Sequence, residues 1–225
     1  MIVSSSSSAQ RPLSGARPAP IESGQHGFAL GWLRTVSEVL LQPRRFFSHL
    51  GVGDLRAPLA FAVIALTLPI AVAEFGSLQQ GDTPASHAWL AALKILLVPV
   101  LGALWVATVQ ASVWHRVLRW FGSSKVPLNV AMRAMSYLTS FAATFGVVMT
   151  IAGFAPESAP YVIAWYGSLS AVLLLSFYAL LTIARGPYGL SVGRGIGAVL
   201  VFEGCYAVVV FVSALAWFAV MAPAS

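Results

Sequence analysis

Charged residues are scarce in this chain of 225 residues, because only 9% are Asp, Glu, Lys or Arg while 58% are hydrophobic. Together with a mean hydropathy of +0.83, this scarcity excludes the polar surface of an ordinary soluble protein. The composition therefore predicts a multispan membrane protein. Because each long apolar run has the length of a membrane helix, the expected fold class is all-α.

Residues that carry common enzyme chemistry are also few. Cys205 is the single cysteine, so neither an internal disulfide nor a cysteine-based metal site can form. The four histidines lie in four segments without a zinc-binding spacing. The run from Gly193 to Gly197 follows no strand, so it does not predict a phosphate-binding loop. We therefore expect no catalytic residue, cofactor or metal, and a protein that is not an enzyme.

Apolar runs divide the chain into five predicted spans. The first, residues 57 to 75, has no charge before Glu74, and about 19 helical residues cross a hydrocarbon core roughly 30 Å thick. Four more follow at residues 89 to 113, 134 to 154, 161 to 184 and 196 to 220. We expect residues 57 to 220 to form a five-span membrane domain.

Basic residues predict the orientation. Acidic residues number 7 against 13 Lys and Arg, and the basic ones are spread between the spans, so nucleic acid is not an expected partner. Twelve of the 13 fall in the N-terminal region or in the second and fourth connections, and Lys94 is the exception. The positive-inside rule then places the N-terminus in the cytosol and the tail at residues 221 to 225 outside.

The region before the first span has two parts. Residues 1 to 26 are rich in Ser, Pro and Arg, which predicts a disordered cytosolic tail. Residues 27 to 56 are expected to form an amphipathic interfacial segment, with a helix over residues 28 to 42 that ends at Pro43. At 100° per residue its apolar arc holds Phe28, Ala29, Trp32, Leu33, Val36, Val39 and Leu40, and its polar arc holds Arg34, Thr35, Ser37, Glu38 and Gln42.

Two interpretations of this segment remain open. It can lie in the membrane plane, with Trp32, Phe46 and Phe47 at headgroup depth and Arg44 and Arg45 facing lipid phosphates. Alternatively, its helix packs on the cytosolic end of the bundle.

Three short motifs carry a family resemblance. They are Asp54-Leu55-Arg56-Ala57-Pro58-Leu59 before the first span, Ala134-Met135-Ser136-Tyr137 opening the third, and Gly189-Leu190-Ser191-Val192-Gly193-Arg194-Gly195 entering the fifth. Their order, with five spans, resembles the Yip-domain family of Ypt-interacting membrane proteins. Arg56 and Ala57 stand where eukaryotic members have Tyr and Gly, no Pro follows Tyr137, and Tyr188 stands where a His is often found.

The resemblance implies a small helical membrane protein without catalysis. Eukaryotic members bind prenylated Rab GTPases and help vesicle traffic, whereas the role of most bacterial members is unknown. The departures at Arg56 and Ala57 favour a bacterial member, and the resemblance then implies the bacterial inner membrane. A Rab GTPase is an expected partner only if the chain is eukaryotic.

Polar residues inside the predicted spans give three expectations. Glu74 and Lys94 lie near the outer ends of adjacent antiparallel helices and should pair. Glu203 should turn into the bundle and either stay protonated or meet a donor, because a carboxylate in lipid is costly. The candidate donors at similar depth are Ser136, Tyr137 and Ser140, and Arg133 or His115 could reach from the inner ends of their spans.

The third predicted span has one polar face, made by Ser136, Thr139, Ser140, Thr144 and Thr150. This face could line a transport path, or it could make interhelical hydrogen bonds and close packing.

The leading functional hypothesis is a non-enzymatic interaction or membrane-organising module. Its partners would be the lipid bilayer and a protein on the cytosolic face. The predicted interaction surface consists of Arg44, Arg45, Phe46, Phe47, Asp54, Arg56 and Pro58. The alternative is a small transporter or channel subunit.

Overall fold

The computed structural model describes residues 18–23, 27–79, 88–123, 125–153 and 159–221, and every regular element within them is a helix. Three short helices come first: α1 (Pro20–Ser23), α2 (Gly27–Leu41) and α3 (Pro43–Ser48). The long elements are α4 (Arg56–Gln79), α5 (Ala88–Trp105) continued by a π-helical turn (Val106–Gln110) and α6 (Ala111–Trp120), α7 (Leu128–Gly153), α8 (Ala159–Arg185) and α9 (Val192–Met221). The all-α fold class is thus confirmed.

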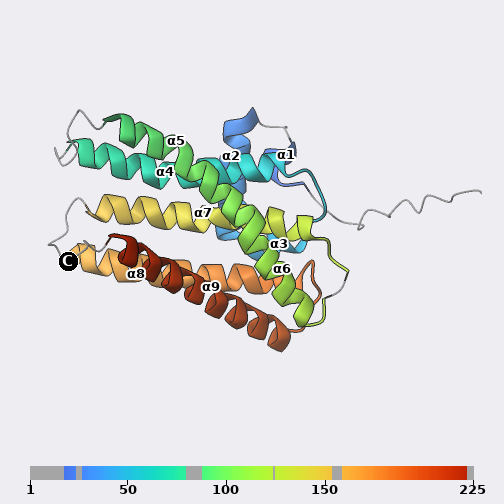
Figure 1. Cartoon of the computed structure of the whole chain (residues 1–225). Helices are drawn as coiled ribbons and strands as arrows, with labels where there is room; N and C mark the ends of the chain where they lie inside the picture. Colours follow the sequence, from blue (N-terminus) through green and yellow to red (C-terminus); the bar gives the residue numbers. More distant parts are fainter. Residues whose placement is uncertain (1–17, 24–26, 80–87, 124, 154–158, 222–225) are drawn as a thin grey trace, which may run out of the picture.

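The long helices lie roughly alongside one another, and α7 occupies the middle of the bundle (Figure 1). Helix α7 contacts α4 on one side, α8 on another and both the π-helical turn and α6 on a third. Helices α1, α2, α3 and α6 gather toward the end opposite the C-terminus (Figure 1). This end also holds the connections that precede α4, α7 and α9, and Lys125 lies in the second of them.

Four helices are long and apolar enough to cross a membrane: Arg56–Ser77, Trp89–Trp120, Tyr166–Arg185 and Val192–Val209. Large apolar side chains on their outward faces are exposed, such as Leu96, Leu174 and Val208. Soluble monomers rarely expose such contiguous apolar surface. The four helices therefore indicate a multi-pass membrane protein. Helix α7, which contains the third predicted span, is not among the four.

The ends of the helices differ from the predicted spans at the basic end of the bundle. Helix α7 begins at Leu128 rather than at residue 134, and the second long helix continues to Trp120 rather than ending near residue 113. Arg116 and Arg119 therefore lie on the exposed side of α6, and its other side buries Trp114 and Leu118. Both helices therefore continue past the predicted apolar spans. The added turns contain polar residues, and they are helical because their apolar sides pack on protein.

The expectation of a disordered tail through residue 26 is wrong for residues 18–23. Helix α1 packs against α2, and Ala19 and Ile21 are buried. The Ile21 backbone N–H donates to Thr35 Oγ1 at 3.1 Å. This turn is ordered because α2 gives its apolar side chains a surface to cover. The rest of the predicted tail, residues 1–17 and 24–26, and residues 222–225 of the outside tail lie outside the described residues.

The predicted helix over residues 28 to 42 corresponds to α2, but its buried face is rotated. Gly31, Thr35 and Val39 are buried, whereas Phe28 and Leu33 from the predicted apolar arc are more than half exposed. Thr35 was placed on the polar arc. It is buried because α1 covers it, and its hydroxyl donates to the Gly31 carbonyl at 2.8 Å.

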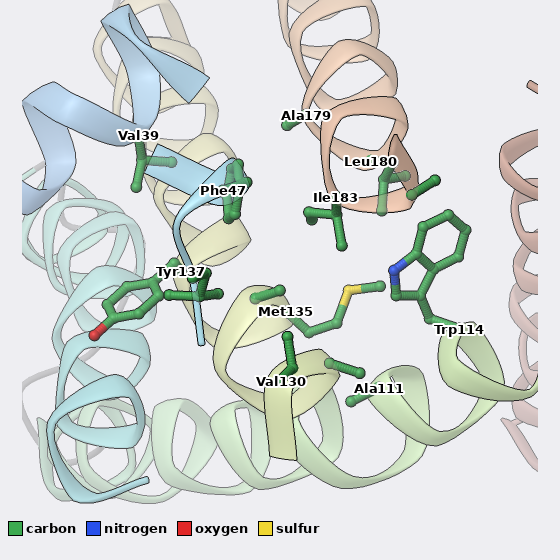
Figure 2. Packing of buried hydrophobic residues seen from close by; sticks show 14 of the residues in the cluster. Val39, Phe47, Ala111, Trp114, Val130, Met135, Tyr137, Ala179, Leu180 and Ile183 are labelled. Carbon is green, nitrogen blue, oxygen red and sulfur yellow. The ribbon is translucent and has the colours of Figure 1, made fainter. Parts of the chain in front are cut away.

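The core joins the short helices to the bundle. Figure 2 shows Val39 of α2 and Phe47 of α3 beside α7, with Met135 of α7 pointing toward the indole of Trp114. Phe46 and Phe47 are both buried, so their rings contact protein, which agrees with the interpretation that packs this segment on the bundle. Helix α3 turns these rings inward because it packs along α8.

Candidate functional site

A buried arginine lies where the N-terminal segment meets the bundle. Arg133, in the second turn of α7, is only 3% exposed. Its Nη2 lies 2.6 and 2.5 Å from the two carboxylate oxygens of Glu22 in α1. Its Nη1 donates to the carbonyl of Gly51, and among the described residues its buried Nε has no partner. A charge pair between residues 111 apart therefore fixes α1 to the middle helix.

Tyr137 extends this arrangement by one helical turn. Its hydroxyl donates to Glu22 Oε1 at 2.6 Å. Its buried ring meets Phe46 and Phe61 edge to face, with ring centroids 5.1 and 5.2 Å apart. The carboxylate of Glu22 thus accepts from both Arg133 and Tyr137. Tyr137, a motif residue, acts here as an anchor for the N-terminal segment.

A hollow of about 420 Å³ opens beside the ion pair. Glu22 and Arg133 line it together with the loop from Gly51 to Asp54 and the start of α4. The loop is held to α7 because the Gly53 N–H donates to Asn129 Oδ1 at 3.2 Å. The mouth therefore combines a buried charge pair with the exposed residues Asp54 and Arg56.

The Asp-Leu-Arg-Ala-Pro-Leu motif has a structural role. Asp54 Oδ1 accepts from the Arg56 backbone N–H at 3.1 Å, which supports the first turn of α4. Pro58 is buried, and Leu55 and Leu59 are half-buried. The Arg56 side chain is 94% exposed, and its contact with Asp54 at 3.7 Å is therefore a weak surface pair.

The predicted interaction surface is therefore smaller than expected. Arg44, Arg45, Asp54 and Arg56 are exposed, whereas Phe46, Phe47 and Pro58 lie in the interior. The predicted surface position of these three apolar residues is wrong, because α3 and the start of α4 pack them against the bundle.

The third motif lies apart from the first two. Arg194 is exposed beside the turn at Gly122. Tyr188 is buried, and its hydroxyl is hydrogen-bonded to His115 Nδ1 at 3.1 Å. Burial raises the pKa of Tyr188, so the phenol stays protonated at physiological pH. This contact ties the connection before α9 to α6.

The predicted pair of Glu74 and Lys94 is present. Lys94 Nζ lies 2.8 Å from Glu74 Oε1, with the Glu74 side chain 15% exposed and that of Lys94 58% exposed. The pair joins α4 to α5, as expected for antiparallel neighbours. It leaves the aliphatic stem of Lys94 free to lie along apolar surface.

Exchanging the two charges tests this pair. We expect Glu74→Lys and Lys94→Glu each to lower the melting temperature in detergent, because each places two like charges together. The double variant should regain stability, with a coupling free energy of about 1 kcal/mol. A double variant no more stable than the worse single variant would show that the contact adds nothing.

The hydroxyls of α7 bond within their own helix. Ser136, Thr139, Ser140, Thr144 and Thr150 all donate to carbonyls three or four residues earlier. The expected hydrogen bonds to other helices are therefore wrong for these groups. The same interpretation also predicted close packing of this face. Ser136, Thr139 and Ser140 are buried, as close packing requires.

Glu203 does not turn into the bundle. It is exposed on α9, next to Gly204 and Cys205. The inward side of α9 is made by Ala198, Val199 and Phe202, and Phe202 packs on Trp114 with ring centroids 5.1 Å apart. The predicted donors are engaged elsewhere: Tyr137 and Arg133 bind Glu22, and His115 binds Tyr188. Because α9 packs on the bundle through Ala198, Val199 and Phe202, the Glu203 carboxylate points outward.

Glu22 was not among the predicted site residues, and Arg133 was considered only as a donor for Glu203. The available signal was a single acidic residue in the N-terminal Ser- and Pro-rich segment, next to apolar Ile21. No local pattern could pair it with an arginine so far along the chain.

In the part of the chain that the structure describes, no three His, Cys, Asp or Glu side chains gather as a metal site. No family model matches the chain, and neither the curated proteins nor the solved structures include one with significant similarity to it.

Proposed function

We propose that this chain is a five-span inner-membrane protein of the Yip-domain type that acts as a non-enzymatic interaction or membrane-organising module through its cytosolic end. The observation that carries this proposal is the Glu22–Arg133–Tyr137 cluster. It holds the N-terminal segment in one position against the bundle. A fixed arrangement of α1, α2 and α3 is what a binding face at this end requires.

We propose that helix α7, third in chain order among the spans, crosses the membrane in addition to the four candidate helices. Its 26 residues correspond to about 39 Å, which exceeds the hydrocarbon thickness. Its central place among other helices supports the assignment, because its polar residues then need not face lipid. Five spans put the N-terminus and the basic connections in the cytosol and the C-terminus outside.

Helix α2 is the proposed interfacial helix. Its inward face packs on α1 and α7, while Phe28 and Leu33 are exposed on its outer side. Those apolar side chains suit the headgroup boundary, where an amphipathic helix buries one face. In this arrangement α2 both packs on the bundle and contacts lipid.

The binding face proposed for a protein partner is formed by Asp54 and Arg56 at the mouth of the Arg133 hollow. Both side chains are exposed and are positioned by the loop that Asn129 and Arg133 hold. A Rab GTPase fits only a eukaryotic host, and we propose a bacterial protein of unspecified identity instead.

Topology reporters test the orientation. A reporter that is active only outside the cytosol should be active when fused after Ser225 and silent when placed near Ser124. The reverse result would overturn the five-span arrangement.

Site-specific photocrosslinking in membranes tests the binding face. A crosslinker at position 56 should give a discrete adduct, whereas one at the exposed Lys125 should give none. The position-56 adduct should disappear with Asp54→Ser, since Ser keeps the helix-capping oxygen but removes the charge. Equal adducts at both positions would contradict a specific face. The transporter alternative predicts solute flux in proteoliposomes, and we expect permeability to equal that of empty liposomes.

A further inference from the structure

Two arginines from different helices flank a hollow at the basic end of the bundle. Arg44 of α3 and Arg185, the last residue of α8, line a hollow of about 380 Å³. Ser48, Thr182, Gly186 and Leu190 form much of the remaining wall. Both arginines are exposed, so their guanidinium groups can reach a ligand.

The hollow is a fixed feature of the packing between α3 and α8. A Cβ added at Gly186 would lie 2.8 Å from the Ser48 Cα, so only glycine lets α3 sit this close to the end of α8. Phe46 and Phe47 hold α3 from its other side in the core. The distance between the two arginine backbones is therefore set by tight packing.

A second hollow, of about 470 Å³, adjoins the first and shares Arg44, Ser48 and Tyr178 with it. It adds Arg45 and His49 to the wall. Among the described residues that line either hollow, no side chain is a carboxylate. The combined groove thus has three arginines with no acidic group between them, which favours an anion and in particular a phosphate.

One wall of the groove is apolar and leads along a membrane-spanning helix. Tyr178, Leu181 and Arg185 follow one another at helical spacing on the outer side of α8, while Ala179, Leu180 and Ile183 point into the core (Figure 2). The candidate span Tyr166–Arg185 ends at the arginine. A ligand here has its charge at the end of the span and its apolar part beside Leu181.

We infer that this groove binds an anionic phospholipid of the surrounding bilayer, with the phosphate between Arg44 and Arg185 and an acyl chain along Tyr178 and Leu181. Basic pockets at the cytosolic ends of membrane helices are suited to such headgroups. The inference rests on the proposed orientation, which puts this end at the cytosolic headgroups. It does not depend on the proposed protein partner.

Native mass spectrometry of the full chain in detergent tests the site. With phosphatidylglycerol added, the wild type should retain one lipid in preference to phosphatidylcholine. Arg44→Gln and Arg185→Gln should each weaken retention about fivefold, and the double variant about 25-fold, which corresponds to about 1 kcal/mol for each arginine. Arg44→Lys with Arg185→Lys should keep part of the affinity, because the charges remain.

Arg56→Gln is the matched control, since Arg56 is an exposed arginine at the same end but outside this groove. It should retain phosphatidylglycerol like the wild type, and all variants should keep the wild-type melting temperature without lipid. Equal retention of both lipids, or loss of retention with Arg56→Gln as large as with Arg44→Gln, would overturn the site. Displacement of the lipid by millimolar inorganic phosphate would identify a soluble phosphate as the ligand and overturn the lipid assignment. The photocrosslinking result at position 56 is independent of these outcomes.

Discussion

Replacing Arg133 with Met should lower the free energy of unfolding by about 3–5 kcal/mol, because it leaves the Glu22 carboxylate without its buried partner. The Glu22 side chain is only 13% exposed and loses two short contacts with Nη2. The carboxylate then keeps only two neutral donors, the Tyr137 hydroxyl and the Ala19 backbone N–H, among the described residues. Chemical or thermal unfolding in detergent measures the change.

Arg56→Met is the control for this variant. Arg56 is 94% exposed, so its replacement should change stability by less than about 0.5 kcal/mol. Adding Glu22→Met to Arg133→Met should recover part of the loss, because the isolated charge is then removed. Stability of Arg133→Met equal to that of Arg56→Met would contradict an anchoring role for the ion pair.

Hydrogen exchange locates the effect of Arg133→Met. The Ile21 amide is held by Thr35 Oγ1, and its protection depends on α1 staying against α2. We expect the Ile21 amide to exchange faster in Arg133→Met while amides in the middle of α8 keep their protection. Uniform loss of protection along the chain would instead indicate a general loss of stability.

Adding a side chain at Gly146 should separate α4 from α7. A Cβ at this position would lie 2.5 Å from the Pro69 Cβ and 3.1 Å from its Cγ. The proline ring is rigid, so the two helices must move apart. Overpacking of this kind costs about 1–3 kcal/mol for Gly146→Ala and more for Gly146→Leu. The measurement is the free energy of unfolding in detergent.

Gly167→Ala is the matched control. Gly167 also lies inside a long helix, α8, but a Cβ there meets no heavy atom within 4 Å. Its replacement should be neutral or slightly stabilising, because alanine favours a helix by about 1 kcal/mol over glycine. If Gly146→Ala proved as stable as Gly167→Ala, the contact between Pro69 and Gly146 would not limit the approach of the two helices.

Local patterns predicted the helices well because their signals are local. Continuous apolar sequence from residue 57 to 75 marks α4, and Pro43 marks the end of α2. The pair of Lys94 and Glu74 was also predictable, since the two helices are consecutive and antiparallel and each charge sits near the same end. These features depend only on neighbours in sequence.

Periodicity could not predict what covers an apolar face. It left two interpretations of the segment around Phe46 and Phe47 open and placed Thr35 on the polar arc, whereas α8 and the bundle core cover the two rings and α1 covers the threonine. An apolar stripe has the same pattern whether lipid or protein lies against it. Glu203 was predicted to turn inward because a carboxylate in lipid is costly. The structure differs because α9 packs through Phe202 and leaves Glu203 exposed.

The sequence by itself determined the helical class, the positions of the long helices and the concentration of basic residues in alternate connections, because composition and hydrophobic runs act over short stretches. Only the tertiary structure decided that Glu22 reaches Arg133 and Tyr137 across more than a hundred residues. It also decided that Arg44 and Arg185 share one groove. Contacts of this kind depend on how separate helices pack, and no spacing within one segment encodes them.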